Sequence, residues 1–466
     1  MEQRNKGQWA SSFGFLMAAV GSAVGLGNLW GFPYKMGVNG GFAFLLIYLI
    51  LVAFVGVVIM IAELSFGRKS GKGIVATYES LDKKYAFVGW FGWISPLLIL
   101  GFYSMLGGYC IKYAVANLGD LFNATWGVGD ADSGEYFAGF YSDQLQTVVF
   151  SLVFIALTIF IVRGGVSEGI EKFSSIAMPA LFVMLLVVII RSLTLDGAMA
   201  GVEFMFKPNF EVFKGSGWIS VLAAAGGQMF FSLSLGMAIM ITYGSYMKKS
   251  ESLQRNAVII PIADTIIALM AGLAIMPAVF ASGLDPAQGP GLLFVTLQTV
   301  FHELGSLGPI FGFLFYFLVF IAAITSSISL MEAVGSTVTD KRLEKGKKAT
   351  RNSSTMFVGI IVAIEAVFVS LDGLGSNGFP QILNQGCWLD TFDLISEGVL
   401  MPLGALIMSL IFGWFNVGYL DDELALDPGG FKLKKYFQFC IRWIVPPIML
   451  LVLLGQIDTF FQIGWF

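Results

Sequence analysis

Histidine and cysteine are scarce in this sequence. Among its 466 residues there is one histidine, His302, and there are three cysteines, Cys110, Cys387 and Cys440, which lie far apart with no Cys-x-x-Cys or Cys/His spacing. The sequence therefore offers no set of ligands for zinc or haem and no Cys–His pair for catalysis. We expect no enzymatic activity from this chain.

Charge is scarce as well. Charged residues make up 12% of the chain and hydrophobic residues 56%, whereas soluble domains are typically about 25% charged. Eleven hydrophobic runs are long enough to cross a bilayer as helices. These runs cover 9–36, 41–67, 89–118, 146–163, 173–191, 217–247, 256–281, 309–339, 354–371, 390–417 and 437–462. The sequence predicts an all-α polytopic membrane protein, with 1–466 forming one domain.

Cationic residues set the expected orientation, because Lys and Arg concentrate in cytoplasmic loops. With the N-terminus inside, most of the 27 Lys and Arg lie in cytoplasmic segments, and the opposite loop 119–145 is rich in acids. The first run is too long for a signal peptide, so we expect it to be retained. An odd number of spans then places the C-terminus outside the cytoplasmic membrane.

The first span contains a stretch that disfavours a continuous helix. Gly21, Gly25 and Gly27 lie close together, followed by Asn28, and each interior Gly costs about 1 kcal/mol relative to Ala. A span broken here exposes amides and carbonyls that bind ions and small zwitterions. A glycine-lined packing face for a neighbouring helix explains the glycines about as well.

The sixth span is similarly interrupted, at 231–237, by serines and a glycine. If spans 1–5 (9–191) and spans 6–10 (217–417) are inverted repeats, both interruptions fall on the first helix of their half, and span 11 (437–462) lies outside the repeat. Paired interruptions of this kind are the best sequence pointer to the central site of a transporter.

These motifs together resemble the neurotransmitter:sodium symporter family, in its bacterial branch. The resemblance covers about residues 6 to 420 and rests on the 21–28 stretch, Phe32-Pro33, 39–41, Glu63 with Gly67-Arg68, 228–236, and 325–327. It is strongest to the eleven-span type that carries several hydrophobic amino acids. It implies the leucine-transporter-like fold of five plus five inverted helices, with spans 1 and 6 broken at mid-membrane.

The resemblance implies two sodium sites. The first would comprise Ala23, Asn28, Ser232 and Asp264, and the second Gly21, Val24, Ala322, Thr325 and Ser326. Asp264 stands where many relatives carry Asn, and the acidic position of other chloride-independent relatives is Ala268 here. A mid-membrane carboxylate usually marks a function, so Asp264 would replace chloride, although it would also suit a structural bond to a neighbouring helix. The hydroxyls of span 8 also suit ordinary bonds to their own helix.

The resemblance also implies a substrate site between the broken spans. Amides of Leu26 and Gly27 begin a half-helix that suits a carboxylate, and Tyr103 would donate to the same group. Gly25 replaces the Asp of amine-transporting relatives, which favours an amino acid. The remaining substrate residues are Ala23, Ile99, Phe231, Ser232, Ser234, Met237, Ser326 and Leu330. The side-chain pocket is uncharged, so it predicts an apolar substrate. Each of its residues alone also suits a packed core.

Gates and supports follow from the same resemblance. The cytoplasmic gate would use Lys6 or Arg4, Trp9, Tyr246 and Asp340, and the external gate Asp390 and Asp393, whose usual Arg partner is Gly31 here. Lys35 or water would replace that Arg. Glu63 and Gln228 would support the broken helices. Gly169 and Pro179, with nine residues between them, favour an inner segment of span 5 that unwinds, although ordinary helix-end chemistry explains them as well.

The sequence as a whole predicts a sodium-coupled, chloride-independent symporter of hydrophobic L-amino acids. It would use two sodium ions, with lipid as its surroundings and no nucleic-acid partner. The oligomeric state stays open, a monomer included. A channel would need a continuous polar pore, whereas the intramembrane polar residues cluster at mid-depth. A sensor that binds without transport fits the same residues.

Overall fold

The computed structural model describes residues 8–286, 291–347 and 349–465, and this part of the chain contains helices and no strand. The helices of the first half are α1 (Ser12–Ala23), α2 (Phe32–Val38), α3 (Phe42–Leu51), α4 (Val57–Ser70), α5 (Ile74–Leu81), α6 (Ala86–Leu121), α7 (Ser133–Ser142), α8 (Gln144–Arg163), α9 (Lys172–Leu193) and α10 (Met199–Phe206). Those of the second half are α11 (Gly217–Ser232), α12 (Ile239–Gly244), α13 (Leu253–Ala281), α14 (Leu297–Glu303), α15 (Gly308–Glu344), α16 (Arg351–Asp372), α17 (Trp388–Asp393), α18 (Met401–Leu410), α19 (Asp421–Ala425), α20 (Lys434–Phe439) and α21 (Val445–Phe461).

Several spans combine α-helix with π-helical turns. Such turns join α3 to α4, precede α2 and α9, and lie within the tenth and eleventh spans; they cover Gly27–Gly31, Val52–Gly56, Val166–Glu171, Leu394–Leu400, Ile411–Phe415 and Cys440–Ile444. Span 5 therefore begins at Val166, earlier than the predicted 173. Its first turn carries Glu168 and Glu171, so hydropathy assigned it to the loop.

Nine helical segments among the described residues are long and apolar enough to cross a membrane, or ten if the bent pair Ser12–Ala23 and Gly27–Val38 is one span. The predicted sixth span is absent from that number because it consists of the two short helices α11 and α12, separated by residues 233–238. The predicted total of eleven spans stays a prediction.

The predicted break in the first span is confirmed. α1 ends at Ala23, Val24 is extended with φ −77° and ψ 109°, and a helix resumes at Gly27 after a bend of 47°. Val24 still donates to the carbonyl of Val20, whereas the next two amides no longer have partners within α1. Gly25 and Gly27 lie where the helix is weakest, as their low propensity predicts.

The sixth span is also interrupted. Three residues between α11 and α12 have positive φ: Ser234 at 54°, Gly236 at 74° and Ala238 at 57°. Positive φ is uncommon for residues other than glycine, and here a buried carboxylate compensates. Glu63 of α4 accepts the N–H of Gly236 at 2.8 Å through Oε1. This bond satisfies an amide that the helix no longer pairs.

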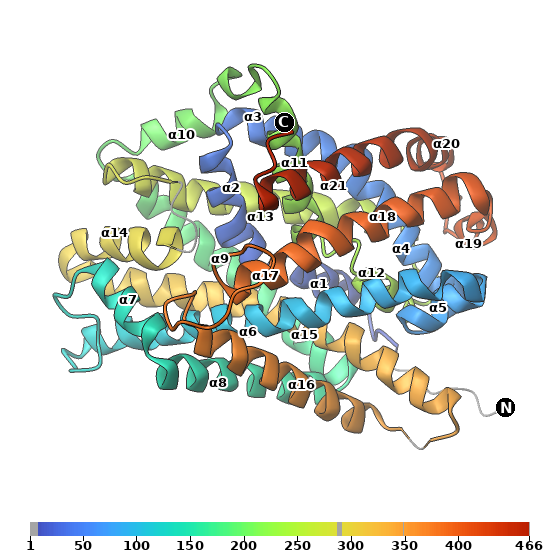
Figure 1. Ribbon diagram of the computed structural model, residues 1–466, viewed down its shortest axis with the longest axis horizontal. Coiled ribbons are helices and arrows are strands. Elements are labelled where there is room, and N and C mark those ends of the chain that lie inside the picture. The colour runs from blue at the N-terminus through green and yellow to red at the C-terminus, as the bar shows by residue number, and fades with distance from the viewer. Residues whose placement is uncertain (1–7, 287–290, 348, 466) are drawn as a thin grey trace.

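The two broken spans lie against long, continuous helices. α6, α8, α15 and α16 run alongside one another across the lower half of Figure 1. α1 packs against α9, α13 and α15, and α12 packs against α4. The breaks are therefore enclosed by intact helices, which is where irregular backbone is tolerated in a membrane.

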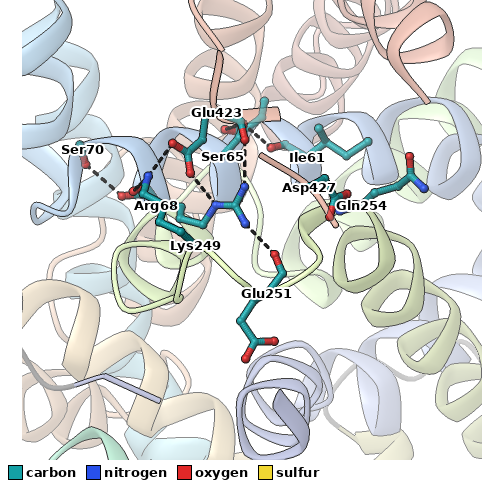
Figure 2. Close-up of polar contacts among 11 residues, drawn as sticks. Ile61, Ser65, Arg68, Ser70, Lys249, Glu251, Gln254, Glu423 and Asp427 are labelled. Atoms are coloured by element: carbon teal, nitrogen blue, oxygen red, sulfur yellow. Dashed lines mark hydrogen bonds and ion pairs between the residues drawn. The ribbon is translucent and has the colours of Figure 1, made fainter. Parts of the chain in front are cut away.

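A polar cluster ties the end of α4 to two distant segments (Figure 2). The buried Arg68 bonds the carboxylate of Glu423 in α19 at 2.6 Å and the backbone carbonyl of Glu251 at 2.8 Å. Lys249 donates to the second oxygen of Glu423 at 2.5 Å. The side chain of Glu251 points away from this cluster, and its carboxylate accepts the hydroxyl of Ser12 at the start of α1 at 2.7 Å.

Candidate functional site

A small central cavity lies between the two breaks. Its volume is about 20 Å³, which is room for about one water molecule. The lining residues come from spans 1, 3, 6 and 8: Ser22, Ala23, Gly25, Gly27, Ile99, Tyr103, Phe231, Ser234, Met237, Ser326 and Leu330. Of the predicted substrate residues, Leu26 and Ser232 lie outside this lining, and Ser22 is an addition. A ligand larger than water fits this cavity only if side chains move.

The predicted carboxylate donors are bonded to each other. The amide of Leu26 donates to the hydroxyl of Tyr103 at 3.1 Å, and the amide of Gly25 donates to the side-chain oxygen of Asn28 at 3.0 Å. A Cβ on Gly25 would lie 2.5 Å from the Tyr103 hydroxyl oxygen and 2.4 Å from Oγ of Ser326. The backbone at Gly25 is therefore in close contact with side chains of α6 and α15, and position 25 has no space for a side chain.

Asp264 lies at the centre of the predicted first sodium site. Its side chain is fully buried in α13. Its Oδ1 accepts a hydrogen bond from Nδ2 of Asn28 at 2.7 Å. Its Oδ2 accepts hydrogen bonds from the hydroxyl of Ser232 at 2.9 Å and from the hydroxyl of Tyr48 at 3.2 Å. The carboxylate thus meets the hydroxyls of Ser232 and Tyr48 and the amide nitrogen of Asn28, whose oxygen instead accepts the amide of Gly25. Carboxylate and hydroxyl oxygens are hard donors that suit a hard cation.

The second predicted sodium site also comes together. The hydroxyl of Ser326 lies 3.2 Å from the carbonyl oxygen of Val24 and 3.4 Å from that of Gly21. A Cβ on Gly21 would lie 3.3 Å from Cβ of Thr325, so α1 and α15 are in close contact here. Thr325 donates to the carbonyl of Ala322 at 2.9 Å. The carbonyls of Gly21 and Val24 thus face the hydroxyl of Ser326, whereas the hydroxyl of Thr325 bonds within α15.

Phe231 separates the central cavity from a larger one. The larger cavity, which we call the vestibule, has a volume of about 530 Å³. Gly27 and Phe231 line both cavities, and the ring centroid of Phe231 lies 6.4 Å from that of Tyr103. A Cβ on Gly27 would lie 2.8 Å from the Phe231 ring. Rotation of this ring would connect the vestibule to the central cavity.

An ion pair crosses the vestibule. Lys35 of α2 pairs with Glu397, one turn beyond the predicted gate residue Asp393, and all three line the cavity together with Asp390. The Glu397 side chain is nearly buried and the Lys35 side chain partly exposed. A Cβ on Gly31 would lie 2.9 Å from Oε1 of Gln228. Gln228 in turn donates to the carbonyl of Gly27 at 2.7 Å.

The opposite side of the central cavity is closed by packed side chains. Trp9 donates through Nε1 to the carbonyl of Tyr243 at 3.2 Å and packs edge-on against the rings of Tyr243 and Tyr246. Tyr246 donates its hydroxyl to Glu332 of α15 at 2.6 Å, and Glu332 pairs with Arg351 at 2.7 Å. These contacts join spans 1, 6, 8 and 9.

Asp340, the predicted acid of the cytoplasmic gate, lies near this closed side. Its Oδ2 accepts the amide of Gly73 at 2.6 Å. The predicted partners Lys6 and Arg4 lie outside the described residues. Gly169 and Pro179 lie in the helical start of span 5, where Gly169 is in the π-helical turn and Pro179 is inside α9. The segment predicted to unwind is wound in this structure.

A comparison with protein families decides the identity. The model of the sodium:neurotransmitter symporter family matches residues 6–129 and 141–465. The chain belongs to this family. Curated relatives that are similar over nearly their whole length include the uncharacterized sodium-dependent transporter YhdH of Bacillus subtilis, which is 36% identical over 98% of this chain and 99% of its own. An uncharacterized sodium-dependent transporter of Haemophilus influenzae is 30% identical over 96% and 98% respectively.

A solved member of the sodium:neurotransmitter symporter family matches the architecture. The crystal structure of MhsT in complex with L-phenylalanine superimposes with a TM-score of 0.87 at 37% sequence identity, over 97% of this chain and all of that chain. The predicted resemblance to this family, including its bacterial hydrophobic amino acid type, is confirmed. The chain is a sodium-dependent transporter with a leucine-transporter-like arrangement of helices.

Sequence reasoning missed several buried charges of this family member. Glu332 is an acid within a predicted span, so the argument applied to Asp264 would have identified it. The same holds for Glu365 of α16, whose buried Oε2 has no hydrogen-bond partner in the part of the chain that the structure describes. Glu171 lay in a predicted loop, and the choice of Glu397 as the partner of Lys35 had no local signal.

Proposed function

We propose that this protein is a sodium-coupled symporter that takes up hydrophobic L-amino acids by alternating access and catalyses no chemical reaction. The observation that carries the proposal is the arrangement around Phe231. A vestibule and a central cavity meet at one aromatic ring, beside two interrupted helices, while packed aromatic and charged side chains close the other side. One side open and one side closed is the geometry that alternating access requires.

The substrate class follows from the walls of the central cavity. Its lining carries no charged side chain, so a charged substrate side chain would be buried without a partner at considerable cost. The half-helix that begins near Leu26 suits a carboxylate, and the carbonyls of Ala23, Phe231 and Ser232 suit an ammonium group. Met237 adapts to side chains of varied shape. The L-phenylalanine bound to MhsT supports an apolar amino acid.

Two sodium ions would accompany the substrate. The first would bind Ala23, Asn28, Ser232 and Asp264, and the second Gly21, Val24, Ala322, Thr325 and Ser326. Asp264 would supply the negative charge that chloride supplies in other relatives, so transport would be independent of chloride. The convergence of Asn28 and Ser232 on the Asp264 carboxylate supports this assignment.

The remaining parts of the proposal concern architecture. The chain would form one domain, 1–466, with eleven spans. Residues 9–191 and 217–417 would form inverted repeats, and 437–462 the eleventh span. The N-terminus would face the cytoplasm and the C-terminus the outside of the cytoplasmic membrane. The vestibule is then external, Lys35 and Glu397 replace the usual external gate, and Trp9, Tyr246, Glu332 and Asp340 form the internal one.

Uptake by purified protein in liposomes tests the function. An inward sodium gradient is expected to drive accumulation of labelled leucine or phenylalanine, with no accumulation in potassium or choline and no change when gluconate replaces chloride. Excess tryptophan is expected to compete, and aspartate and lysine are not. Binding without gradient-driven accumulation would identify a sensor and refute the symporter. Sodium-independent accumulation would refute the coupling.

A further inference from the structure

A groove opens on the surface where spans 4 and 5 meet. α8 ends at Arg163, and the π-helical turn Val166–Glu171 leads into α9. Beyond this turn α8 packs against α6 and α16, whereas α9 packs against α1 and α13. The two helices therefore diverge and leave between them a groove of about 670 Å³. Ligand sites in proteins are typically about 300 to 1,000 Å³, so the groove has room for a lipid head group.

The polar part of this groove favours an anion. Arg163 at the end of α8 and Lys172 at the start of α9 both line it and are exposed. Neither cation has an acidic partner in the part of the chain that the structure describes. Asn352, in the first turn of α16, lines the groove as well. That turn contains no acid, and the unpaired amides at a helix start favour negative charge. Glu168 is the acid in the lining, so the two cations outnumber it.

The apolar part of the groove continues into the lipid-facing surface of both spans. Phe160 of α8 is 78% exposed and Ile176 of α9 is 69% exposed, and both line the groove. Further exposed apolar residues follow at spacings of three, four or seven, namely Val149, Val153 and Leu157 on α8 and Val183, Val187 and Ile190 on α9. Such spacings place side chains on one helix face. Because both helices are long and apolar enough to cross a membrane, these faces contact acyl chains.

We propose that this groove binds a phospholipid whose head group carries a net negative charge, such as phosphatidylglycerol. Its phosphate pairs with Arg163 and Lys172, and its acyl chains follow the exposed faces of α8 and α9. Guanidinium and ammonium groups are common partners of phosphate, and basic pockets between transmembrane helices bind anionic head groups. A soluble anion would leave Phe160 and Ile176 uncovered. A zwitterionic lipid would bring a cation of its own to the two cations of the groove.

The position of the groove along the membrane normal supports an anionic lipid. Glu171, in the turn between the two spans, accepts the amide of Ala10 at 2.7 Å, so the groove lies on the side of the membrane where α1 begins. In the proposed orientation this is the cytoplasmic side, whose surface carries anionic lipids that attract Lys and Arg. The inference goes beyond the proposed transport function, because lipid binding requires neither sodium nor an amino acid.

Lipid retention by the full-length protein tests the proposal. Dioleoylphosphatidylglycerol is added in steps to protein in detergent micelles that contain dioleoylphosphatidylcholine, and native mass spectrometry measures how much of each lipid stays bound. The double variant Arg163→Gln with Lys172→Gln is expected to weaken retention of phosphatidylglycerol about 30-fold, since each cation near a membrane surface contributes about fivefold. Retention of phosphatidylcholine is expected to change little, because that head group has no net charge.

The matched control removes two exposed lysines that lie outside the groove, in Lys432→Gln with Lys435→Gln. These lysines are on the same side of the membrane. Gln254 accepts the amide of Leu433 at 3.0 Å, and Gln254 lies close to Glu251, which bonds the start of α1 (Figure 2). The control is expected to retain phosphatidylglycerol like the wild type. Equal losses in the two double variants would show attraction by total charge alone and would overturn the groove as a site.

Glu168→Gln tests the groove in the opposite direction. The Glu168 carboxylate lines the groove and repels a phosphate, so neutralising it is expected to tighten retention of phosphatidylglycerol about fivefold, the size of one surface charge. This variant breaks no hydrogen bond or ion pair among the described residues, so it decides the question if the groove double variant does not fold. Unchanged or weaker retention in Glu168→Gln would overturn the proposal, as would equal retention of the two lipids by the wild type.

Discussion

Replacing Asp264 with Asn tests the origin of the fixed charge at the proposed first sodium site. The carboxylate receives hydrogen bonds from Asn28, Ser232 and Tyr48, all at 3.2 Å or less. An Asn at this position keeps one oxygen but loses the charge, and its amide group faces hydrogen-bond donors. We therefore expect weaker sodium binding together with a side chain that is imperfectly bonded in its own site.

The magnitude follows from the charge. Two unit charges about 4 Å apart interact by about 4 kcal/mol at an effective dielectric constant of about 20. Because the Asn oxygen still ligates, the expected loss is about 2 to 4 kcal/mol, which corresponds to about 30- to 1,000-fold weaker sodium binding. Sodium titration of labelled leucine binding, at constant ionic strength, measures it directly.

The matched control neutralises a different carboxylate, that of the half-buried Glu365. Glu365→Gln removes a charge from α16, where the side chain lies beside Gly101, and is expected to leave the sodium titration unchanged. Adding Ala268→Ser to Asp264→Asn is expected to restore part of the sodium affinity only when chloride is present. Unchanged sodium affinity in Asp264→Asn, or a chloride requirement in the wild type, would refute the role of this carboxylate.

Three further predictions concern the cavity, the vestibule and span 5. Gly25→Ala overpacks the site at a cost of about 1 to 3 kcal/mol, so competition binding should show about 5- to 150-fold weaker leucine binding; wild-type affinity would contradict the close contact at this position. Lys35→Met leaves the nearly buried Glu397 without its partner and should lower the melting temperature, whereas adding Glu397→Gln should restore much of it; purely additive effects would show that the pair contributes nothing. Pro179→Ala supplies a missing backbone donor, so it should slow uptake while leaving equilibrium sodium binding intact; normal uptake would contradict unwinding of span 5.

The sequence predicted the spans well because long apolar runs in a membrane have few alternatives to helix. The break near Gly25 was also predictable, since glycine propensity acts locally. The residues around the central cavity came from the family resemblance, and Ile99 or Leu330 alone would have been assigned to a packed core. Local sequence patterns do not show which charged residues pair between distant spans.

Two pairings illustrate this limit. Lys35 and Glu397 are 362 residues apart, and nothing near either residue identifies the other. Glu171 was hidden for a different reason, because two acids in one turn lowered its hydropathy and placed it outside the predicted span. A charged residue that bonds to a neighbouring helix makes its own segment more polar, and the sequence pattern then predicts a loop there.

The bond between the Leu26 amide and the Tyr103 hydroxyl has a consequence for turnover. If a substrate carboxylate binds at these two groups as proposed, it would gain new bonds but end an existing one, so its net binding energy would be the difference between two sets of similar hydrogen bonds. A carrier has to let go of its cargo in every cycle, and excessive affinity would trap it. Because the Leu26 amide already has an internal partner in the Tyr103 hydroxyl, an amino acid bound there as proposed would be held less tightly, and its release would be favoured.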